Sequence, residues 1–232
     1  MHDTWEQLTH DIITCRRCPR LVGWREEVAR IKRRAYKDWT YWGKPVPGFG
    51  DRAARLLIIG LAPGAHGANR TGRMFTGDSS GNTLFAALHR AGFANQPGSH
   101  TRDDGLQLYD TFISAVVRCV PPKNRPTADE IAQCQPFLAR EIGLLSNLQV
   151  VLALGRTAFQ GYLRLLKASG YRGSRLSFQH GLEVQLPSPL PTLFASYHPS
   201  QRNTQTGLLT PEMLDELLER IRHTLKKSGR RP

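Results

Sequence analysis

Residues 55–81 read RLLIIGLAPGAHGANRTGRMFTGDSSG, and the fold class is most easily predicted from this stretch. It begins with a short apolar run, RLLIIG, which is rich in β-forming residues and too short for a buried helix. A long loop follows, and the whole stretch holds glycines at positions 60, 64, 67, 72, 77 and 81. Active sites in open α/β sheets form beyond the carboxyl ends of the strands, so we expect functional residues in this loop.

Three further apolar runs resemble the first, TFISAVV at 111–117, QVVLAL at 149–154 and TLFASYH at 192–198. Patterns typical of helices separate or follow the four runs, at 80–92, 127–145, 156–170 and 210–227. Strands that alternate with helices predict a three-layer α/β/α sandwich around a four-stranded, mainly parallel sheet. We also expect a hairpin within residues 172–187.

The first fifty residues differ from this alternating pattern. Residues 3–13 have helical periodicity, and residues 39–50 are aromatic, proline-rich and irregular. Between them, residues 16–37 carry nine Lys or Arg residues and only two acidic ones, which predicts a partly exposed basic helix. No repeat or low-complexity linker divides the chain, so we expect residues 1–232 to form a single domain.

The composition indicates a soluble protein with a polyanionic partner. Lys and Arg outnumber Asp and Glu by 32 to 19, and the net charge is +13. A charge this large on one domain favours nucleic acid, because phosphate contacts release condensed counterions. No apolar run approaches the roughly 20 residues that cross a bilayer, and the polar N-terminus does not resemble a signal peptide. We therefore expect a cytoplasmic protein that does not bind membranes.

The chain has four cysteines, Cys15, Cys18, Cys119 and Cys134, and the first two form a C-x-x-C pair. A cytoplasmic protein does not keep structural disulfides, so four thiols of this kind suggest a four-thiolate metal centre. Zinc and an iron–sulfur cluster both remain possible at this point. Either centre would tie the N-terminal segment 1–50 to the rest of the domain.

The loops that follow the strands carry the candidate functional groups. The first loop contains His66, Asn69, Phe75 and Asp78, and the fourth run ends in His198 within an H-P-S triplet. The glycines match neither G-x-G-x-x-G nor the phosphate loop G-x-x-x-x-G-K-[ST], which argues against a nucleotide hydrolase. Long ordered loops are usually functional, so a mere connection is the weaker interpretation.

Four ordered motifs together resemble one known family. They are GLAPGAHGANRTGRMFTGDSSG, VRCVPPKNRPT, LALGRTAF and YHPSQRNTQTG, and with the four cysteines they are similar to the family 5 (B-type) uracil-DNA glycosylases. The resemblance implies the uracil-glycosylase α/β sandwich and a [4Fe–4S] cluster on Cys15, Cys18, Cys119 and Cys134. It also implies removal of uracil, and of other deaminated bases such as hypoxanthine or xanthine, from DNA. We expect a monomer that acts on double-stranded and also on single-stranded DNA.

The first motif departs from the wider superfamily. It reads G-L-A-P, with Leu61 and Ala62 where an acidic residue usually positions the water, and Ala115 stands where an Asn usually reads uracil. Both departures are typical of the B-type branch. The resemblance therefore assigns catalysis to Asp78 and His198. The substrate-binding candidates are Gly60, Ala62, Gly64, His66, Asn69, Phe75, Asn124 and Ser200.

Simpler interpretations stay open for several of these residues. Asp78 precedes a helix and could only cap it, and Phe75 could be ordinary core packing. Residues 201–206 could wedge into the duplex. The alternative is that the chain is a non-catalytic nucleic-acid-binding protein with a structural zinc site. This alternative explains the charge and the cysteines but not the glycine-rich loop.

Overall fold

Four parallel strands form the centre of the molecule. The computed structural model describes residues 3–228, and residues 1–2 and 229–232 of the expected domain lie outside them. The parallel strands are β2 (Leu56–Gly60), β3 (Thr111–Ala115), β4 (Val150–Leu154) and β6 (Thr192–Ser196). The register pairs Ile58 with Ile113 on one side and with Leu152 on the other. The predicted parallel core is therefore confirmed.

The sheet is wider than the sequence predicts. Two short antiparallel strands flank the core, β1 (Phe49–Gly50) beside β3 and β5 (Leu182–Val184) beside β6. The described residues thus form a six-stranded sheet with the order β1-β3-β2-β4-β6-β5. The expected hairpin within 172–187 is wrong. The strand in this range, β5, pairs with β6, which lies outside the range.

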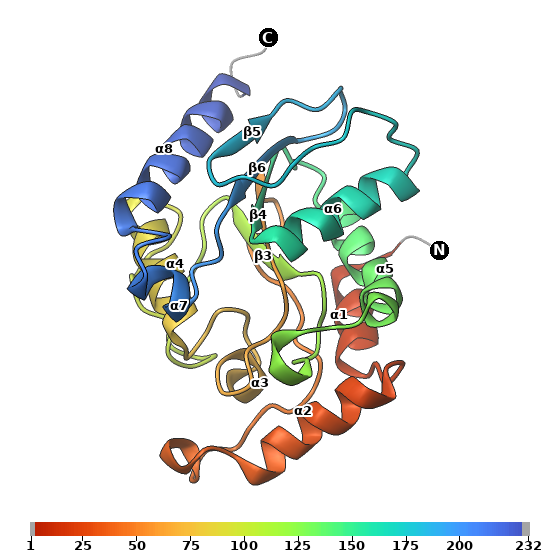
Figure 1. Cartoon of the computed structure of the whole chain (residues 1–232), viewed down its shortest axis with the longest axis vertical. Helices are drawn as coiled ribbons and strands as arrows, with labels where there is room; N and C mark the ends of the chain where they lie inside the picture. Colours follow the sequence, from red (N-terminus) through yellow and green to blue (C-terminus); the bar gives the residue numbers. More distant parts are fainter. Residues whose placement is uncertain (1–2, 229–232) are drawn as a thin grey trace.

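Helices cover both faces of the sheet. The α-helices are α1 (Trp5–Ile13), α2 (Pro19–Ile31), α3 (Ala68–Thr71), α4 (Ser79–Arg90), α5 (Ala128–Leu144), α6 (Arg156–Ala168), α7 (Gln201–Gln205) and α8 (Pro211–Ser228). Two short 3₁₀ helices are η1 (Arg34–Tyr36) and η2 (Pro122–Asn124). Figure 1 shows α4 and α8 on one side of the sheet and α1, α5 and α6 on the other. None of the helices in this described part is long and apolar enough to span a bilayer.

Every residue of β2 is buried, because both faces of the strand are covered. Leu57 and Ile59 pack toward α1, α5 and α6, whereas Leu56 and Ile58 pack toward α4 and α8. This alternation follows from the two-residue period of a strand. It explains why the strand reads as a continuous apolar run rather than as an alternating pattern.

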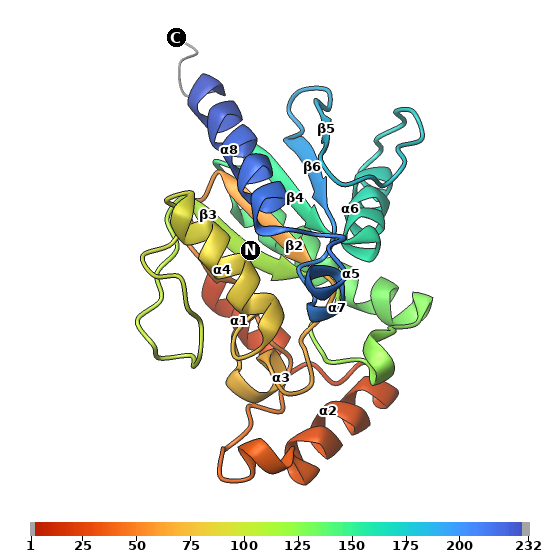
Figure 2. The ribbon, with the colours of Figure 1, turned by 60° about the vertical axis from the view of Figure 1, so that its left-hand side comes forward.

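The helix in the basic N-terminal segment is shorter than predicted. Helix α2 ends at Ile31, where Lys32 takes φ +60°, and the chain then continues through η1. The expectation of one helix over 16–37 is therefore wrong. Figure 2 shows α2, α3 and α7 gathered at one end of the molecule, beyond the sheet.

The loop after β2 lies at a reversal of the strand order. The chain leaves β2 for β3 through α4 on one face, and leaves β4 for β6 through α6 on the other face. Neighbouring strands whose connections run to opposite faces leave a crevice between their carboxyl ends. The loops after β2, β4 and β6 therefore share this end of the sheet.

Candidate active site

An aromatic stack joins the first loop to the last strand. The rings of Phe75 and His198 are stacked, with centroids 5.8 Å apart and planes inclined by 27°. Gly60 makes room for this stack, because a Cβ there would lie 2.8 Å from the Phe75 ring. Phe75 also takes φ +53°, a left-handed conformation that is costly for a bulky residue. Such strain is typical of functional sites.

Asp78 follows Phe75 by three residues in the chain, and its two carboxylate oxygens have different surroundings. Its Oδ1 accepts a hydrogen bond from the backbone N–H of Gly81 at 3.0 Å, so Asp78 caps helix α4. Its Oδ2 is turned toward the backbone of Gly64 and Gly67, and a Cβ on Gly64 would lie 2.9 Å from that oxygen. The cap uses one carboxylate oxygen, and the glycine-rich loop surrounds the other.

Burial shifts the pKa of both candidate catalytic residues. Desolvation raises the pKa of Asp78, although N–H groups of Gly81 and Ser80 and the charge of Arg70 oppose the shift. Desolvation lowers the pKa of His198 to about 4. His198 is therefore neutral at physiological pH, and a neutral imidazole can still donate one hydrogen bond.

Backbone contacts fix the position of His198. Its carbonyl oxygen accepts hydrogen bonds from the N–H of Ser200 and from Nδ2 of Asn203, both at 2.8 Å. Gly155 follows β4 and has φ +91°. It packs against the histidine, because a Cβ on Gly155 would lie 3.3 Å from the Cβ of His198. Gly155 is not among the predicted site residues, although it begins the G-R-T-A turn after the third apolar run.

Two predicted substrate contacts in the loop are turned toward the N-terminal segment. Nδ1 of His66 lies 3.0 Å from the hydroxyl of Tyr41. Asn69 is fully buried, and its Nδ2 donates to the carbonyl of Arg25 in α2 at 3.3 Å. Both side chains connect the loop to the segment before it, and their contact with a base stays a prediction. Ala62 packs against the core on the α1, α5 and α6 face.

The remaining predicted residues lie on neighbouring loops at the same end. Asn124 is exposed in η2, after β3, with φ +55°, and Lys123 beside it has φ +54°. Ser200 caps α7, because its Oγ accepts from the N–H of Asn203 at 3.4 Å. Residues 201–206, the predicted wedge, form α7 and its C-cap. The structure thus groups Gly60 with the rings of Phe75 and His198, and Gly64 with the carboxylate of Asp78. It places Asn124 and Ser200 on neighbouring loops.

The four cysteines line one small cavity. Cys15 and Cys18 come from the turn before α2, Cys119 follows β3, and Cys134 lies in α5. Within residues 3–228 no group of three or more His, Cys, Asp or Glu side chains has the arrangement of a site for a single metal ion. Burial raises the pKa of the Cys119 thiol to about 11 and that of Cys134 to about 12, so both stay protonated unless a metal replaces the protons.

Donors and cations surround these thiols. Nη1 of Arg25 donates to Sγ of Cys119 at 3.1 Å, and the backbone N–H of Arg118 donates to Sγ of Cys134 at 3.2 Å. The guanidinium of Arg25 is buried and its Nε has no hydrogen-bond partner among the described residues, whereas the buried guanidinium of Arg118 forms an ion pair with Glu141. N–H donors and buried positive charge suit sulfurs that carry negative charge. The cavity therefore fits an anionic iron–sulfur cluster.

Two exposed arginines of the predicted basic segment form ion pairs within the protein. Arg16 pairs with Glu26, and Arg20 pairs with Glu130. The exposed cations that follow, Arg30, Arg33, Arg34 and Lys37, lie at the end of α2 and around η1. Among the described residues of this segment, the exposed cations without an ion pair are therefore Arg17 and the four in residues 30–37.

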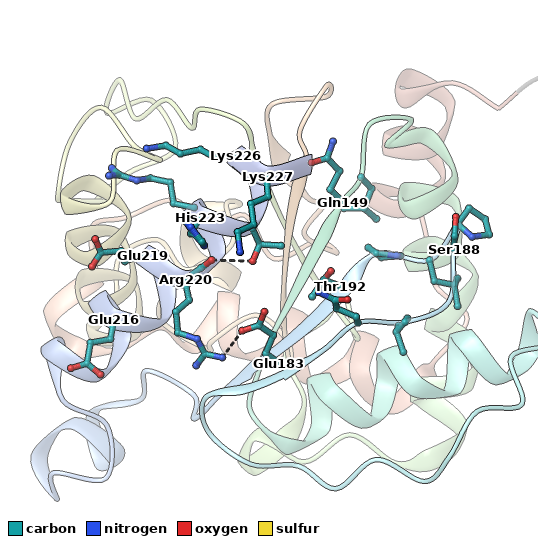
Figure 3. A pocket seen from close by; sticks show the side chains of 18 residues that line it. Gln149, Glu183, Ser188, Thr192, Glu216, Glu219, Arg220, His223, Lys226 and Lys227 are labelled. Atoms are coloured by element: carbon teal, nitrogen blue, oxygen red, sulfur yellow. Dashed lines mark hydrogen bonds and ion pairs between the residues drawn. The ribbon is translucent and has the colours of Figure 1, made fainter. Parts of the chain in front are cut away.

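A large cavity lies elsewhere in the molecule. It measures about 1140 Å³ and lies between α8 and residues 185–192 (Figure 3). Gln149 and Thr192 place it at the amino ends of β4 and β6, whereas His198 follows the carboxyl end of β6. Its wall includes the ion pair of Arg220 with Glu183, at 2.6 Å. It is therefore not part of the candidate active site.

The fold and the site define an α/β protein that gathers a glycine-rich loop, an acid and a histidine beyond a parallel sheet. The sequence model of the uracil DNA glycosylase superfamily matches residues 47–222. The chain is 54% identical to the type-5 uracil-DNA glycosylase of Mycobacterium leprae, over 91% of both chains. It is 51% identical to the type-5 enzyme of Thermus thermophilus, over 92% of this chain and 94% of the relative. The chain therefore belongs to the uracil-DNA glycosylase superfamily and, within it, to the type-5 family that the motifs predict.

Proposed function

We propose that this chain hydrolyses the N-glycosidic bond of uracil in DNA, leaves an abasic site and so begins base excision repair. Membership of the type-5 family supports this reaction. The main structural support is the stack of Phe75 on His198, on a loop that also holds the buried carboxylate of Asp78, because the three residues supply a base platform, a neutral donor and a carboxylate. We extend the proposal to hypoxanthine and xanthine, since G-L-A-P and Ala115 offer little to discriminate against them.

The base must leave the duplex before it can reach these residues. Flipping costs a few kcal/mol and costs least for a mispaired base. Stacking on Phe75 recovers about 1–3 kcal/mol of that cost. Ser200 and the backbone around Gly64 hold phosphates, and residues 201–206 fill the gap in the duplex.

Bond cleavage separates charge between the sugar and the base. The transition state has oxocarbenium character, with positive charge on the sugar and negative charge on the departing base. Neutral His198 donates a hydrogen bond to a carbonyl of the base and stabilises this anion. The lowered pKa of His198 agrees with this role, because the imidazole keeps one N–H and does not protonate the base outright.

Asp78 serves the other half of the charge separation. Its ionised carboxylate orients the attacking water or stabilises the positive sugar, while Oδ1 keeps its hydrogen bond to Gly81. Asn124 assists in holding the base or the water. The cap and the catalytic role do not exclude each other, because they use different oxygens of one carboxylate.

We further propose that Cys15, Cys18, Cys119 and Cys134 hold a [4Fe–4S] cluster. The cluster supplies structural bonds that tie the turn before α2 to β3 and α5. The guanidinium of Arg25 offsets part of its negative charge, and the backbone N–H of Arg118 donates to Sγ of Cys134. The proposal also includes a monomer in the cytoplasm, where reducing conditions keep these thiols available.

One assay tests the reaction. Duplexes and single strands that carry one uracil, hypoxanthine or xanthine are incubated with the protein and then treated with alkali, which cleaves abasic sites. We expect a cut at uracil and at both other bases, and none in a matched strand with thymine. No cut at uracil would contradict the proposed function. A cut at uracil alone would contradict only the wider base range.

A further inference from the structure

Arg70 lies at the centre of the glycine-rich loop and is only 3% exposed. Its Nε donates to the carbonyl oxygen of His66 at 2.7 Å, and its Nη2 donates to the carbonyl oxygen of Gly77 at 2.9 Å. His66 immediately precedes Gly67, which contacts the Asp78 carboxylate, and Gly77 immediately precedes Asp78 itself. One guanidinium group therefore connects the two stretches of backbone that surround Asp78.

Two aromatic rings hold this guanidinium from the N-terminal segment. Its Cζ lies 3.9 Å from the ring centroid of Tyr36 and 4.0 Å from that of Trp39. Such contacts are worth about 2 kcal/mol or more where the cation is desolvated. Backbone bonds reinforce the contact, because the N–H of Trp42 donates to the carbonyl of Arg70 at 2.9 Å.

The guanidinium of Arg70 packs closely against the backbone of Gly77. A Cβ on Gly77 would lie 2.4 Å from Nη2 of Arg70, so this glycine is required for the approach of the guanidinium. Gly77 also has φ +79°, which an L side chain rarely adopts. The arrangement thus leaves a single place for the cation, between the loop and the aromatic pair.

We infer that Arg70 is a positioning residue for Asp78, held in place by Tyr36 and Trp39. It fixes the backbone on both sides of the carboxylate and so sets where Oδ2 lies. This inference rests on the proposed role of Asp78 in base removal. It gives the segment before the sheet a direct part in building the active site, besides its part in DNA binding.

Electrostatics support the geometry. The charge of Arg70 acts on Asp78 and favours its ionised form against the effect of burial. Nη1 of Arg70 is buried and has no hydrogen-bond partner among residues 3–228, so part of the charge is not neutralised by local bonds. A carboxylate that must be ionised in a dry site benefits from a cation that it does not touch.

A double-mutant cycle tests the inference. Arg70→Lys keeps the charge but cannot bond both carbonyls, and we expect it to slow single-turnover uracil excision by about 10-fold, since small misplacements are costly in catalysis. The dissociation constant for DNA should change by less than about twofold. In an Asp78→Asn background the same change should slow excision by less than about twofold, because residues that act through one group are not additive.

Other outcomes separate the possibilities. An equal loss of rate in both backgrounds would mean a general structural role and would overturn the inference while leaving Asp78 in the mechanism. A wild-type rate in Asp78→Asn alone would remove Asp78 from catalysis and the inference with it. If Arg70→Lys does not fold, Trp39→Ala replaces it in the same cycle, with Trp39→Phe expected to restore the rate. Arg52→Lys, which changes an exposed arginine 5.7 Å from the Trp5 ring, is the control and should leave the rate unchanged.

Discussion

Gly67 and Asp78 occupy adjoining space, and a Cβ on Gly67 would lie 2.0 Å from Oδ2 of Asp78. The carboxylate therefore lies where any other residue at position 67 would place its side chain. Gly64 contacts the same oxygen more loosely. Gly64 and Gly67 are thus explained by the position of an acid that follows them in the sequence.

Gly64→Ala should displace the Asp78 carboxylate with little effect on folding. The added Cβ meets only the far end of that side chain, at 2.9 Å, so the side chain can move aside. We expect excision to slow by about 10-fold, as for other small misplacements of a catalytic group. Gly23→Ala is the matched control, because no heavy atom lies within 4 Å of its Cβ. It should keep the wild-type rate and gain about 0.5–1 kcal/mol of stability, as glycine-to-alanine changes in helices do. A wild-type rate in Gly64→Ala would contradict the proposed position of the carboxylate.

Asp78→Asn separates catalysis from helix capping. Asparagine caps helices about as well as aspartate, so the free energy of unfolding should stay nearly constant. The charge is lost, and we expect single-turnover excision to fall by about 10²-fold, which is typical of a missing acid–base or electrostatic group. Affinity for a uracil-containing duplex is measured in parallel and should not change. An unchanged rate would leave Asp78 with the cap alone.

The free energy of unfolding should decrease in mild acid because His198 is buried in its neutral form. Its pKa in the folded protein is about 4, below the usual value of about 6.5, so the unfolded state binds the proton more readily. The stabilising contribution is complete above pH 6.5 and is lost as the pH falls toward 4, by up to about 3 kcal/mol. Urea unfolding at pH 7.5 and pH 5 measures this loss. His198→Gln should lose less stability between the two pH values than the wild type, and an equal loss in both proteins would assign the effect to other groups.

Phosphate contacts should map to η1 and not to the start of α2. Replacing Arg33 and Arg34 by Gln should weaken DNA binding regardless of sequence and reduce the salt slope of the affinity by about 2, or roughly 1 for each contact. Arg16→Gln combined with Arg20→Gln is the control from the same segment. Those two arginines pair with Glu26 and Glu130, so the slope should not change. A slope that falls only in the control pair would reverse the assignment.

The cysteines should bind iron as one set. Cys134→Ala should lower the folded yield, the iron content and the broad visible absorption together, because a cluster needs all four thiolates. Val22→Ala changes the same cavity without removing a sulfur, so it should keep its iron even if it loses stability. A colourless wild-type protein that contains zinc would support the structural zinc site instead.

The sequence alone was enough to predict the parallel core, whereas the roles of the loop residues stay predictions. The four apolar runs became β2, β3, β4 and β6, because strands buried on both faces require continuous apolar residues. The capping box of Thr127 and Glu130 marked the start of α5 for a similarly local reason. The order of the motifs along the chain was enough to predict the family.

The tertiary structure alone decided the contacts between distant segments. Strands β1 and β5 are too short to carry a pattern, and they exist because the edges of β3 and β6 offer them backbone partners. Nothing local to Asn69 reveals that its amide bonds to α2, and nothing local to Arg70 reveals that Tyr36 and Trp39 enclose it. Periodicity and capping act within one or two turns of chain, whereas these contacts join residues that only the packed sheet and the N-terminal segment bring together.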